Sequence, residues 1–193
     1  MFFFLLVIGT KSEGIKAHKF SVDALCKAFD TNVDTGLTEE QAKENLKKYG
    51  PNKPRFISFS PECTMVKREN EWKKINKIDL VPGDVVLLES NSWICADIRI
   101  VNIMEPVCVE SYFLYKDCHT FLKDMTVEQT SEDPLETSNL IFHGTSFFDG
   151  RCLGIVFQTG DNALLNDSDI SYLSDISMPS HDEEKEGFSY WIF

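Results

Sequence analysis

The side chains that could support acid–base catalysis or metal binding are spread along the chain rather than clustered. Two carboxylate pairs could each supply an acid and a base, Glu13 with Asp23 and Glu132 with Asp133. Closeness in sequence does not bring two carboxyl groups to one substrate, so we interpret both pairs as solvated residues. The chain also contains four histidines: His18, His119, His143 and His181. They share no metal-ligand spacing, and we expect no metal site and no bound cofactor.

Cysteines offer a second route to chemistry, through a thiolate, a zinc site or a disulfide. The six cysteines are Cys26, Cys63, Cys95, Cys108, Cys118 and Cys152. No two of them form a C-x-x-C pair, so the sequence predicts neither a zinc site nor a redox pair. Most lie in or beside apolar stretches such as 107–109, which favours reduced thiols buried in a cytosolic domain. The alternative is a small secreted, disulfide-linked protein, although the apolar start 1–8 lacks the basic residues and cleavage site of a signal peptide.

Composition and charge exclude several function classes. The net charge of −12 over 193 residues argues against nucleic acid, because a phosphate backbone requires clustered Lys and Arg. The same charge argues against an acidic membrane surface, and no apolar stretch approaches the ~20 residues that span a bilayer. The sequence has no nucleotide-binding glycine loop, nucleophile elbow, zinc-protease helix or EF-hand loop. A hydrophobic fraction of 42% is enough for a sizeable core, so a globular domain is expected.

Two short helices are predicted near the start of the chain. Ser21 can cap a helix over 22–29, whose apolar residues share one face. Thr38 followed by Gln41 is a capping box for a second helix. The pair Gly50-Pro51 is a strong stop signal for that helix, because glycine supplies a left-handed cap and proline prevents continuation.

From residue 62 onward apolar and polar residues alternate, which predicts strands. A hairpin is predicted first, with strands at 63–67 and 72–75 about the turn 68–71. Further strands are predicted at 85–89, 98–103, 107–110, 140–143 and 152–158. Many short strands separated by Gly and Pro turns favour a β-sandwich or a jelly roll.

Two details of this β-rich region are also predicted. Asp97 and Arg99 alternate with Ile98 and Ile100, which places the charged pair on the outer face of a strand. Residues 121–138 are predicted to form a polar loop.

The sequence divides into four parts by composition. They are an apolar and polar lead at 1–17, a helical segment at 18–52, a β domain at 62–161 and an acidic tail at 162–193. Within the tail, residues 166–186 are rich in Ser, Asp and Glu and are predicted to be mobile.

Several turn and strand motifs follow one another in a specific order. They are His18-Lys-Phe-Ser-Val22, Thr35-Gly-Leu-Thr38, Tyr49-Gly-Pro-Asn52, Ile78-Asp-Leu-Val-Pro-Gly-Asp84, Cys95-Ala-Asp-Ile-Arg-Ile100, Asp133-Pro-Leu-Glu-Thr137 and the stretch 150–161. In this order they resemble the N-terminus and actuator domain of P-type cation ATPases of the sodium/potassium or proton/potassium pump α-subunit type. The resemblance implies an α+β fold, with two short N-terminal helices plus a distorted β jelly roll like that family's actuator domain.

The resemblance also locates the family's dephosphorylation loop. The family's Thr-Gly-Glu-Ser sequence there carries a glutamate that positions water to hydrolyse an aspartyl-phosphate intermediate. The aligned residues in this chain are Tyr115, Lys116, Asp117 and Cys118, so only Asp117 keeps a carboxylate. In addition, residues 52–61 connect the second helix directly to the strands, at the place where the family has its first membrane hairpin. These departures predict a degenerate loop and no catalytic residue.

We therefore expect a truncated and degenerate pump relative that is not an enzyme. The resemblance associates it with sodium and potassium transport and potassium homeostasis, as a pseudoenzyme or an interaction or regulatory fragment in a membrane-associated complex. The expected partner is the α or β subunit of a P-type pump, and the expected location is cytoplasmic, at the plasma membrane through that partner, with no membrane span of its own. The alternative within the family is an actuator module that acts in trans on a pump phosphoenzyme, with Asp117 as its supporting residue.

Overall fold

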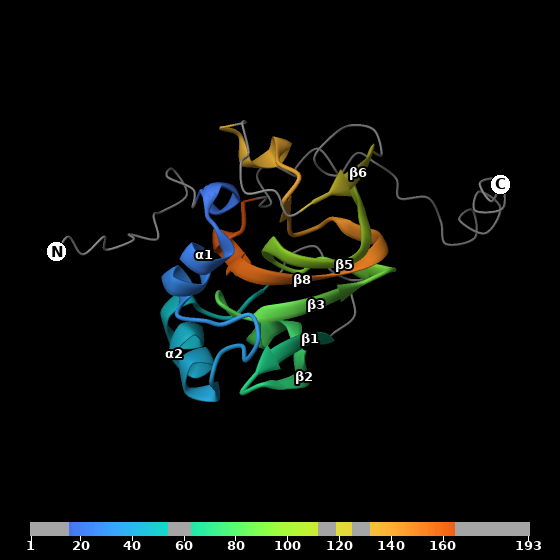
Figure 1. Ribbon diagram of the computed structural model, residues 1–193. Coiled ribbons are helices and arrows are strands. Elements are labelled where there is room, and N and C mark those ends of the chain that lie inside the picture. The colour runs from blue at the N-terminus through green and yellow to red at the C-terminus, as the bar shows by residue number, and fades with distance from the viewer. Residues whose placement is uncertain (1–15, 54–62, 112–118, 125–131, 165–193) are drawn as a thin grey trace.

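The computed structural model describes residues 16–53, 63–111, 119–124 and 132–164. Within these ranges two helices lie beside a curved sheet of eight strands (Figure 1). The helices are α1 (Val22–Phe29) and α2 (Glu39–Tyr49). The strands are β1 (Cys63–Arg68), β2 (Glu71–Asn76), β3 (Val85–Glu89), β4 (Ser92–Trp93), β5 (Asp97–Ser111), β6 (His119–Lys123), β7 (Leu140–Ile141) and β8 (Ser146–Gln158). This arrangement confirms the predicted α+β class, with the short helices ahead of the sheet.

Local hydrogen bonds start both helices where the sequence predicted. At the start of α1, the Ala24 N–H donates to Ser21 Oγ at 3.2 Å. At the start of α2, the Gln41 N–H donates to Thr38 Oγ1 (3.1 Å) and the Thr38 N–H donates to Gln41 Oε1 (2.8 Å). These two bonds form the predicted capping box. Helix α2 ends at Tyr49 with Gly50 as its C-cap, as the stop signal predicted.

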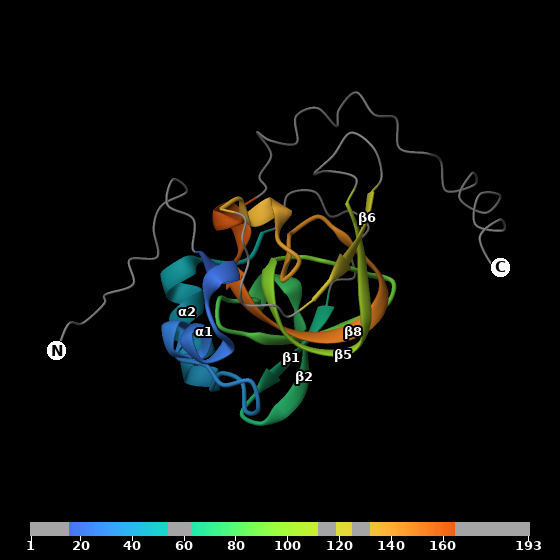
Figure 2. The same cartoon turned by 45° about the horizontal axis from the view of Figure 1, so that its top comes forward.

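The sheet is antiparallel, with the strand order β2-β1-β3-β8-β5-β6. The short strands β4 and β7 pair with β8 and β5 respectively. The two longest strands, β5 and β8, pair along most of their length with several register shifts. Such bulges bend a strand and increase its twist, and Figure 2 shows β5 and β8 curving together.

Strand β5 differs from the prediction, because the two strands expected at 98–103 and 107–110 are continuous. Pro106 lies between them, and the register with β8 shifts across it. Proline has no N–H to donate, so a bulge allows it to stay within a strand. Gly150 of β8 approaches this bulge closely, since a Cβ there would lie 2.1 Å from the Pro106 carbonyl oxygen.

The first hairpin is confirmed, although its turn is tighter than predicted. β1 and β2 pair up to Arg68 opposite Glu71, which leaves Glu69 and Asn70 as the turn. Both turn residues have a positive φ, 52° and 64°, as a two-residue turn of the I′ type requires.

Other strand ends also differ from the prediction. β8 begins at Ser146, well before the predicted residue 152, because it continues to pair with β4 and β5. β6 extends into the predicted loop 121–138, and β7 is only two residues long. Cross-strand pairing decides these ends, and pairing is not visible in the alternation of a single segment.

Apolar side chains fill both faces of the sheet. On one face, Val86 belongs to a cluster of buried residues from β1, β3, β5 and β8. On the other face, Val85 and Ile155 pack with Leu25 and Phe29 of α1. Neighbouring residues of a strand point to opposite faces, so Val85 and Val86 join different clusters. Helix α1 is therefore part of the hydrophobic core.

The prediction that Asp97 and Arg99 lie on an outer strand face is wrong. Their exposed fractions are 0% and 1%, and their strand, β5, is an inner strand that pairs with β8 on one side and with β6 and β7 on the other. Protein groups replace water around both: Arg99 Nη1 donates to the Ile100 carbonyl oxygen at 2.5 Å, and Asp97 accepts two backbone N–H groups. Alternation places two residues on one face, but it does not say whether that face is covered.

Five of the six cysteines fall within the described residues, and all five are free thiols. Burial raises the pKa of Cys95 to about 11 and that of Cys152 to about 12, so both are protonated at neutral pH. No helix in these ranges has the length and apolar character to cross a bilayer. Cys118, the lead up to residue 15 and the predicted mobile stretch 166–186 lie outside the described residues.

Candidate functional site

The four residues predicted at the dephosphorylation loop lie outside the described ranges: Tyr115, Lys116, Asp117 and Cys118. The structure does describe the strands on either side of them. β5 and β6 pair antiparallel up to Ser111 opposite His119. Residues 112–118 therefore connect two strand ends that face each other, at the end of the sheet formed by β6.

Hydrogen bonds hold the far end of β6 to the segment 132–139. Lys123 Nζ donates to the Thr137 carbonyl oxygen at 3.1 Å. The Asp124 N–H donates to the Ser138 carbonyl oxygen (3.1 Å), and Ser138 Oγ donates to Asp124 Oδ1 (2.8 Å). Burial lowers the pKa of Lys123 to about 8, and the charge of Asp124 opposes that shift. These bonds fix the end of β6, the strand that follows the candidate loop and pairs with β5 before it.

Glu132 and Asp133 have separate structural roles and do not form an acid–base pair. Glu132 forms ion pairs with Lys16 and Lys19 at the start of the helical segment. The hydrogen bond from Lys19 is the main reason that the pKa of Glu132 lies below its usual value. Asp133 Oδ1 instead accepts the Leu135 N–H at 2.9 Å and caps the following turn.

The other candidate side chains are not brought together either. Asp23 lies in the first turn of α1, where a carboxylate suits the helix dipole, and Glu13 lies outside the described residues. His18 and His143 are buried in separate segments. In the part of the chain that the structure describes, no group of three or more His, Cys, Asp or Glu residues could hold a metal ion.

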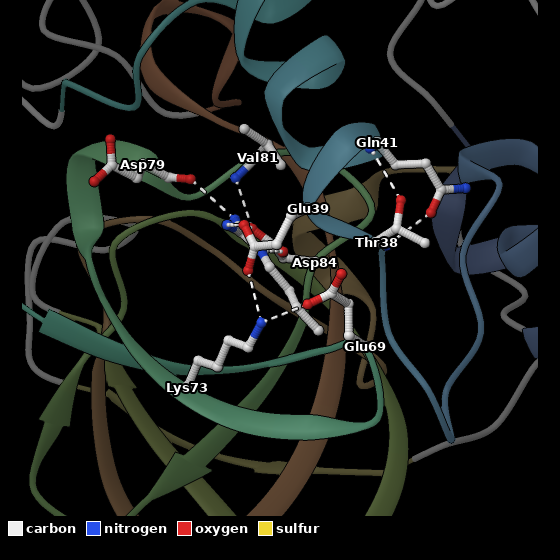
Figure 3. Close-up of polar contacts among 9 residues, drawn as sticks. Thr38, Glu39, Gln41, Glu69, Lys73, Asp79, Val81 and Asp84 are labelled. Atoms are coloured by element: carbon white, nitrogen blue, oxygen red, sulfur yellow. Dashed lines mark hydrogen bonds and ion pairs between the residues drawn. The ribbon is translucent and has the colours of Figure 1, made fainter.

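A buried ion pair that the sequence did not predict joins the hairpin to the turn before β3 (Figure 3). Arg68 Nε donates to Asp84 Oδ1 and Arg68 Nη2 donates to Asp84 Oδ2, both at 2.8 Å. Asp84 Oδ2 also accepts the Val81 N–H at 2.9 Å, and Arg68 Nη2 donates to the Asp79 carbonyl oxygen at 3.1 Å. The side chains of Arg68 and Asp84 are only 7% and 0% exposed. Bidentate geometry and additional hydrogen bonds are what a buried ion pair requires.

The electrostatics of this pair follow from burial and from the bonds within it. Burial lowers the pKa of Arg68, but the hydrogen bonds and charge of Asp84 outweigh burial and raise it above the usual value. Burial raises the pKa of Asp84, while the bonds from Arg68 and from the Val81 N–H oppose that rise. Both side chains are occupied by each other, so we assign the pair a structural role.

Glu39, the first residue of α2, extends this network to the helical segment. Glu39 Oε2 lies 3.7 Å from Arg68 Nη1, and Glu39 Oε1 accepts from Lys73 Nζ at 2.9 Å. Lys73 Nζ also donates to Glu69 Oε2 at 2.8 Å. The bonds to Glu69 and Glu39 raise the pKa of Lys73 to about 12, and the bond from Lys73 lowers the pKa of Glu39. Helix α2 is thereby joined to β1, to β2 and to the turn between them.

A backbone contact joins the same two parts of the chain. The Glu69 N–H donates to the Leu37 carbonyl oxygen at 2.9 Å, next to a single parallel bridge between Leu37 and Arg68. Gly36 makes this approach possible: its φ is 71°, and a Cβ on it would lie 1.7 Å from the Lys67 carbonyl oxygen.

Asn52 provides a second joint between the helical segment and the β domain. It is 1% exposed, and its Nδ2 donates to the carbonyl oxygens of Lys77 and Cys95, both at 3.0 Å. Its Oδ1 accepts the Gly160 N–H at 2.8 Å. One amide thus connects the end of the helical segment to three positions that are distant from it in sequence.

The contacts described above build a scaffold rather than a reaction centre. The side chains of Arg68, Asp84 and Asn52 are all engaged in bonds that hold segments together. Sequence reasoning missed the Arg68–Asp84 pair, because it placed Arg68 in a turn. The only local signal was Asp84 at the end of the Val-Pro-Gly-Asp turn, and a turn motif does not name a distant partner.

Comparison with known proteins identifies both parts of the chain. Residues 58–168 match the P-type ATPase actuator domain, and residues 17–57 match the cation transporter/ATPase N-terminus. Potassium-transporting ATPase alpha chain 2 of Rattus norvegicus is 34% identical over 110 residues, which cover 57% of this chain and 10% of that protein. Sodium/potassium-transporting ATPase subunit alpha-2 of Bos taurus is 32% identical over 110 residues, with the same coverage. Sodium/potassium-transporting ATPase subunit alpha-A of Artemia franciscana is 23% identical over 227 residues, 77% of this chain and 22% of that protein.

The matched regions span about a tenth to about a fifth of the length of these relatives. The actuator match nevertheless covers more than half of the 193 residues, and it includes all eight strands. The chain therefore belongs to the P-type ATPase family, with the N-terminal segment and the actuator domain of the cation pumps.

Proposed function

We propose that this chain is a non-catalytic relative of the sodium/potassium pump α subunit, a pseudoenzyme whose actuator-type module serves in an interaction rather than in phosphate hydrolysis. Its process would be the sodium and potassium transport for which its relatives are named. One observation carries the proposal: all four residues aligned with the family's Thr-Gly-Glu-Ser loop are different.

Three of these differences act against hydrolysis. Lys116 stands where the family has glycine, so a side chain occupies a place where backbone must approach the phosphate closely. Asp117 is one methylene shorter than glutamate, and misplacing a water-orienting group by ~1 Å reduces the rate by about 100-fold. Tyr115 adds bulk in place of a small hydroxyl residue.

The described stem supports this reasoning. The strands on both sides of the loop are paired up to Ser111 opposite His119, and β6 is held at its other end by Lys123 and Asp124. The two ends of the loop are therefore set by an antiparallel strand pair. We propose that the shortened Asp117 side chain is not compensated.

The alternative function is an actuator module that acts in trans on the phosphoenzyme of an intact pump. Asp117 favours it, since a carboxylate is kept, and the charge of Lys116 would attract a phosphate. Attraction to the ground state does not orient water for attack, so this charge gives no rate advantage by itself. We rank the alternative second for that reason.

For partner and location we propose a pump α or β subunit and the cytoplasmic side of the plasma membrane. The alignment with the Artemia franciscana relative is 227 residues long, more than the 193 residues of this chain, so the relative contains residues in this region that have no counterpart here. The two family matches meet at residues 57 and 58, where pumps carry their first membrane hairpin. We interpret the missing residues as that hairpin, and we propose a pump subunit as the link to the membrane.

A loop graft tests the main proposal. Thr-Gly-Glu-Ser in an intact sodium/potassium pump is replaced by the residues found at 115–118, and the decay of labelled phosphoenzyme is followed after a chase. We expect decay about 100-fold slower than in the parent pump. A matched graft carrying the equivalents of Lys116→Gly and Asp117→Glu should recover much of the parental rate. Near-parental decay in the first graft would show that this loop is competent and that the pseudoenzyme proposal is wrong.

Addition of the purified chain to a pump with a disabled loop separates the two functions. The main proposal expects no acceleration of phosphoenzyme decay, together with co-purification of the chain with pump subunits. Acceleration that disappears in the Asp117→Asn variant would establish the trans-acting module instead.

A further inference from the structure

We propose that the acidic segment 167–186 of this chain docks on a basic surface formed by Lys47, Lys48, Lys53 and Lys77, where the helical segment meets the β domain. Neither the segment nor the surface includes the loop 112–118, so this contact does not depend on the function proposed for that loop.

The basic surface lies around the buried side chain of Asn52. Lys47 and Lys48 occupy the last turn of α2, and Lys53 follows Asn52 directly. Lys77 is brought to the same place, because its carbonyl oxygen accepts a hydrogen bond from Asn52 Nδ2 at 3.0 Å. The side chains of Lys47, Lys48 and Lys53 are exposed, and that of Lys77 is partly exposed. Four lysines thus lie on segments that a single amide holds together.

The described residues around this surface do not neutralise it. None of the four lysines forms an ion pair with another residue in the ranges that the structure describes. The carboxylates on the same segments are those of Glu44, Asp79 and Asp161, and the charge of Asp79 already acts on Arg68. An excess of positive charge therefore remains among the described residues of this surface.

The acidic segment is identified as the occupant by its charge and by its attachment to the same chain. Residues 167–186 contain seven carboxylates and one lysine: Asp167, Asp169, Asp175, Asp182, Glu183, Glu184, Glu186 and Lys185. Complementary charge favours the pairing of such a segment with a basic surface. A segment that is covalently attached to the surface it binds has an effective concentration on the order of 1 mM, so weak contacts are sufficient.

The chain enters this segment from a point beside the basic surface. The Gly160 N–H donates to Asn52 Oδ1 at 2.8 Å, and a Cβ at Gly160 would lie 3.1 Å from the Pro51 carbonyl oxygen. The Leu164 N–H donates to Asp97 Oδ2 at 2.6 Å, which attaches the last described residue to the β domain. A stretch of about 20 residues extends to at most about 70 Å, whereas α2 is only about 16 Å long. The acidic segment can therefore reach all four lysines.

The strength of this contact should depend on salt. Ion pairs between exposed side chains are individually weak, and dissolved salt screens them. A contact made of several such pairs is compatible with the mobility predicted for residues 166–186, because each pair can break and re-form separately. While the segment occupies the lysines, any other acidic partner of this surface must displace it.

Zero-length crosslinking of the full chain tests the docking. A carbodiimide joins a lysine amine to a carboxyl group as an amide with loss of water, so it reports pairs in direct contact. An equal mixture of ¹⁵N-labelled and unlabelled chain is treated, and mass spectrometry separates crosslinks within one chain from those between two chains. We expect crosslinks within one chain from 167–186 to the basic surface, at least about fivefold more abundant than those to Lys67. Lys67 is a matched control, because it is also partly exposed but lies at the other end of the β1–β2 hairpin, opposite Trp72.

Salt provides the second readout on the unmodified chain. Raising the NaCl concentration from 10 mM to 1 M shortens the Debye length from about 30 Å to about 3 Å, and the crosslinks to the basic surface should fall by about tenfold. The crosslink between Lys73 and Glu39 is the internal reference. These side chains are 2.9 Å apart within the scaffold, so the yield of their crosslink should change much less.

Charge variants show whether the lysines act together. In the double variant Lys47→Gln with Lys48→Gln, the crosslinks from 167–186 to Lys53 and Lys77 should decrease, although both of these lysines are still present. Lys67→Gln is the matched control and should leave those crosslinks unchanged.

Four results would overturn the proposal. They are equal yields at Lys67 and at the basic surface, yields that do not respond to salt, crosslinks only between labelled and unlabelled chains, and sedimentation of the full chain with phosphatidylserine vesicles that is lost in the double variant. The third result would make a second copy the occupant, and the fourth would make it an anionic membrane. Because the salt series uses the unmodified chain, it decides the question even if a variant does not fold.

Discussion

Replacement of Arg68 by methionine is predicted to destabilise the fold severely, because it leaves the Asp84 carboxylate buried without its counter-charge. Methionine keeps an apolar stem, so the change removes mainly the guanidinium. Two bonds to Asp84, one bond to the Asp79 carbonyl oxygen and the ion pair with Glu39 are lost. Breaking a buried pair in this way lowers the free energy of unfolding by about 3–5 kcal/mol. Folded domains have only about 5–15 kcal/mol in total, so a large part of the stability is at stake.

Adding Asp84→Asn to Arg68→Met is predicted to recover about 2 kcal/mol of that loss. Asparagine has no charge to leave unpaired, and its side-chain oxygen can still accept the Val81 N–H that Asp84 accepts at 2.9 Å. The single variant should also depend on pH. Burial raises the pKa of its Asp84, so the folded state binds more protons than the unfolded state, and stability falls as pH rises between the two pKa values. The stability deficit of Arg68→Met should thus be smaller at pH 5 than at pH 8, and this dependence should be absent from the double variant.

Urea unfolding, followed by far-ultraviolet circular dichroism, measures these differences. The parent, Arg68→Met, Asp84→Asn and the double variant form a complete cycle, whose coupling energy isolates the pair. Lys73→Met is the control: it removes solvent-screened ion pairs with Glu39 and Glu69, and it should change stability far less than Arg68→Met does. A loss below about 1 kcal/mol for Arg68→Met, with no gain in the double variant, would refute the reasoning that Asp84 is desolvated and dependent on Arg68.

Three further predictions concern the joints between the helical segment and the sheet. Thr38→Ala should lower the free energy of unfolding by about 1 kcal/mol, because the Gln41 N–H loses its cap, and Thr38→Ser should restore it in urea titrations. Gly36→Ala should destabilise by clearly more than Gly50→Ala: both glycines have a positive φ, but a Cβ at Gly50 meets nothing within 4 Å, whereas one at Gly36 meets backbone at 1.7 Å. Equal midpoints for these two variants would contradict the close approach. Asn52→Ala should cost about 2–3 kcal/mol through three lost hydrogen bonds, and a calorimetric change below 1 kcal/mol would mean that water replaces them.

Helix ends and the first hairpin could be predicted, because they depend on residues that are close together in sequence. The capping box of Thr38 and Gln41, the cap of Ser21 and the stop at Gly50 all depend on bonds or conformations within one turn of a helix. The β1–β2 hairpin was also found, because alternation and a polar turn are both local signals.

Features set by distant partners were not predictable from the sequence. Asp97 and Arg99 were predicted on an outer strand face, but both are buried, and Asp97 accepts the backbone N–H groups of His143 and Leu164, which are distant in sequence. The strands predicted at 98–103 and 107–110 are one strand, because pairing with β8 continues across the bulge at Pro106. Arg68 was assigned to a turn, since its partner Asp84 lies sixteen residues away. The residues predicted at the dephosphorylation loop came from family resemblance alone, and they lie outside the described residues.

The division between scaffold and loop explains how a chain can keep an actuator fold while the sequence of its loop changes. The bonds of Arg68, Asn52 and Asp97 join segments within 16–53, 63–111 and 132–164, and none of these bonds uses a residue of 112–118. A change of loop chemistry therefore leaves these bonds intact. Conversely, Arg68→Met should weaken the fold without altering the residues that the graft transfers. The graft is expected to slow phosphoenzyme decay, and Arg68→Met is expected to lower the stability of the fold. Together these results would show that the chemistry of the loop and the stability of the fold depend on different residues, as the positions of these bonds imply.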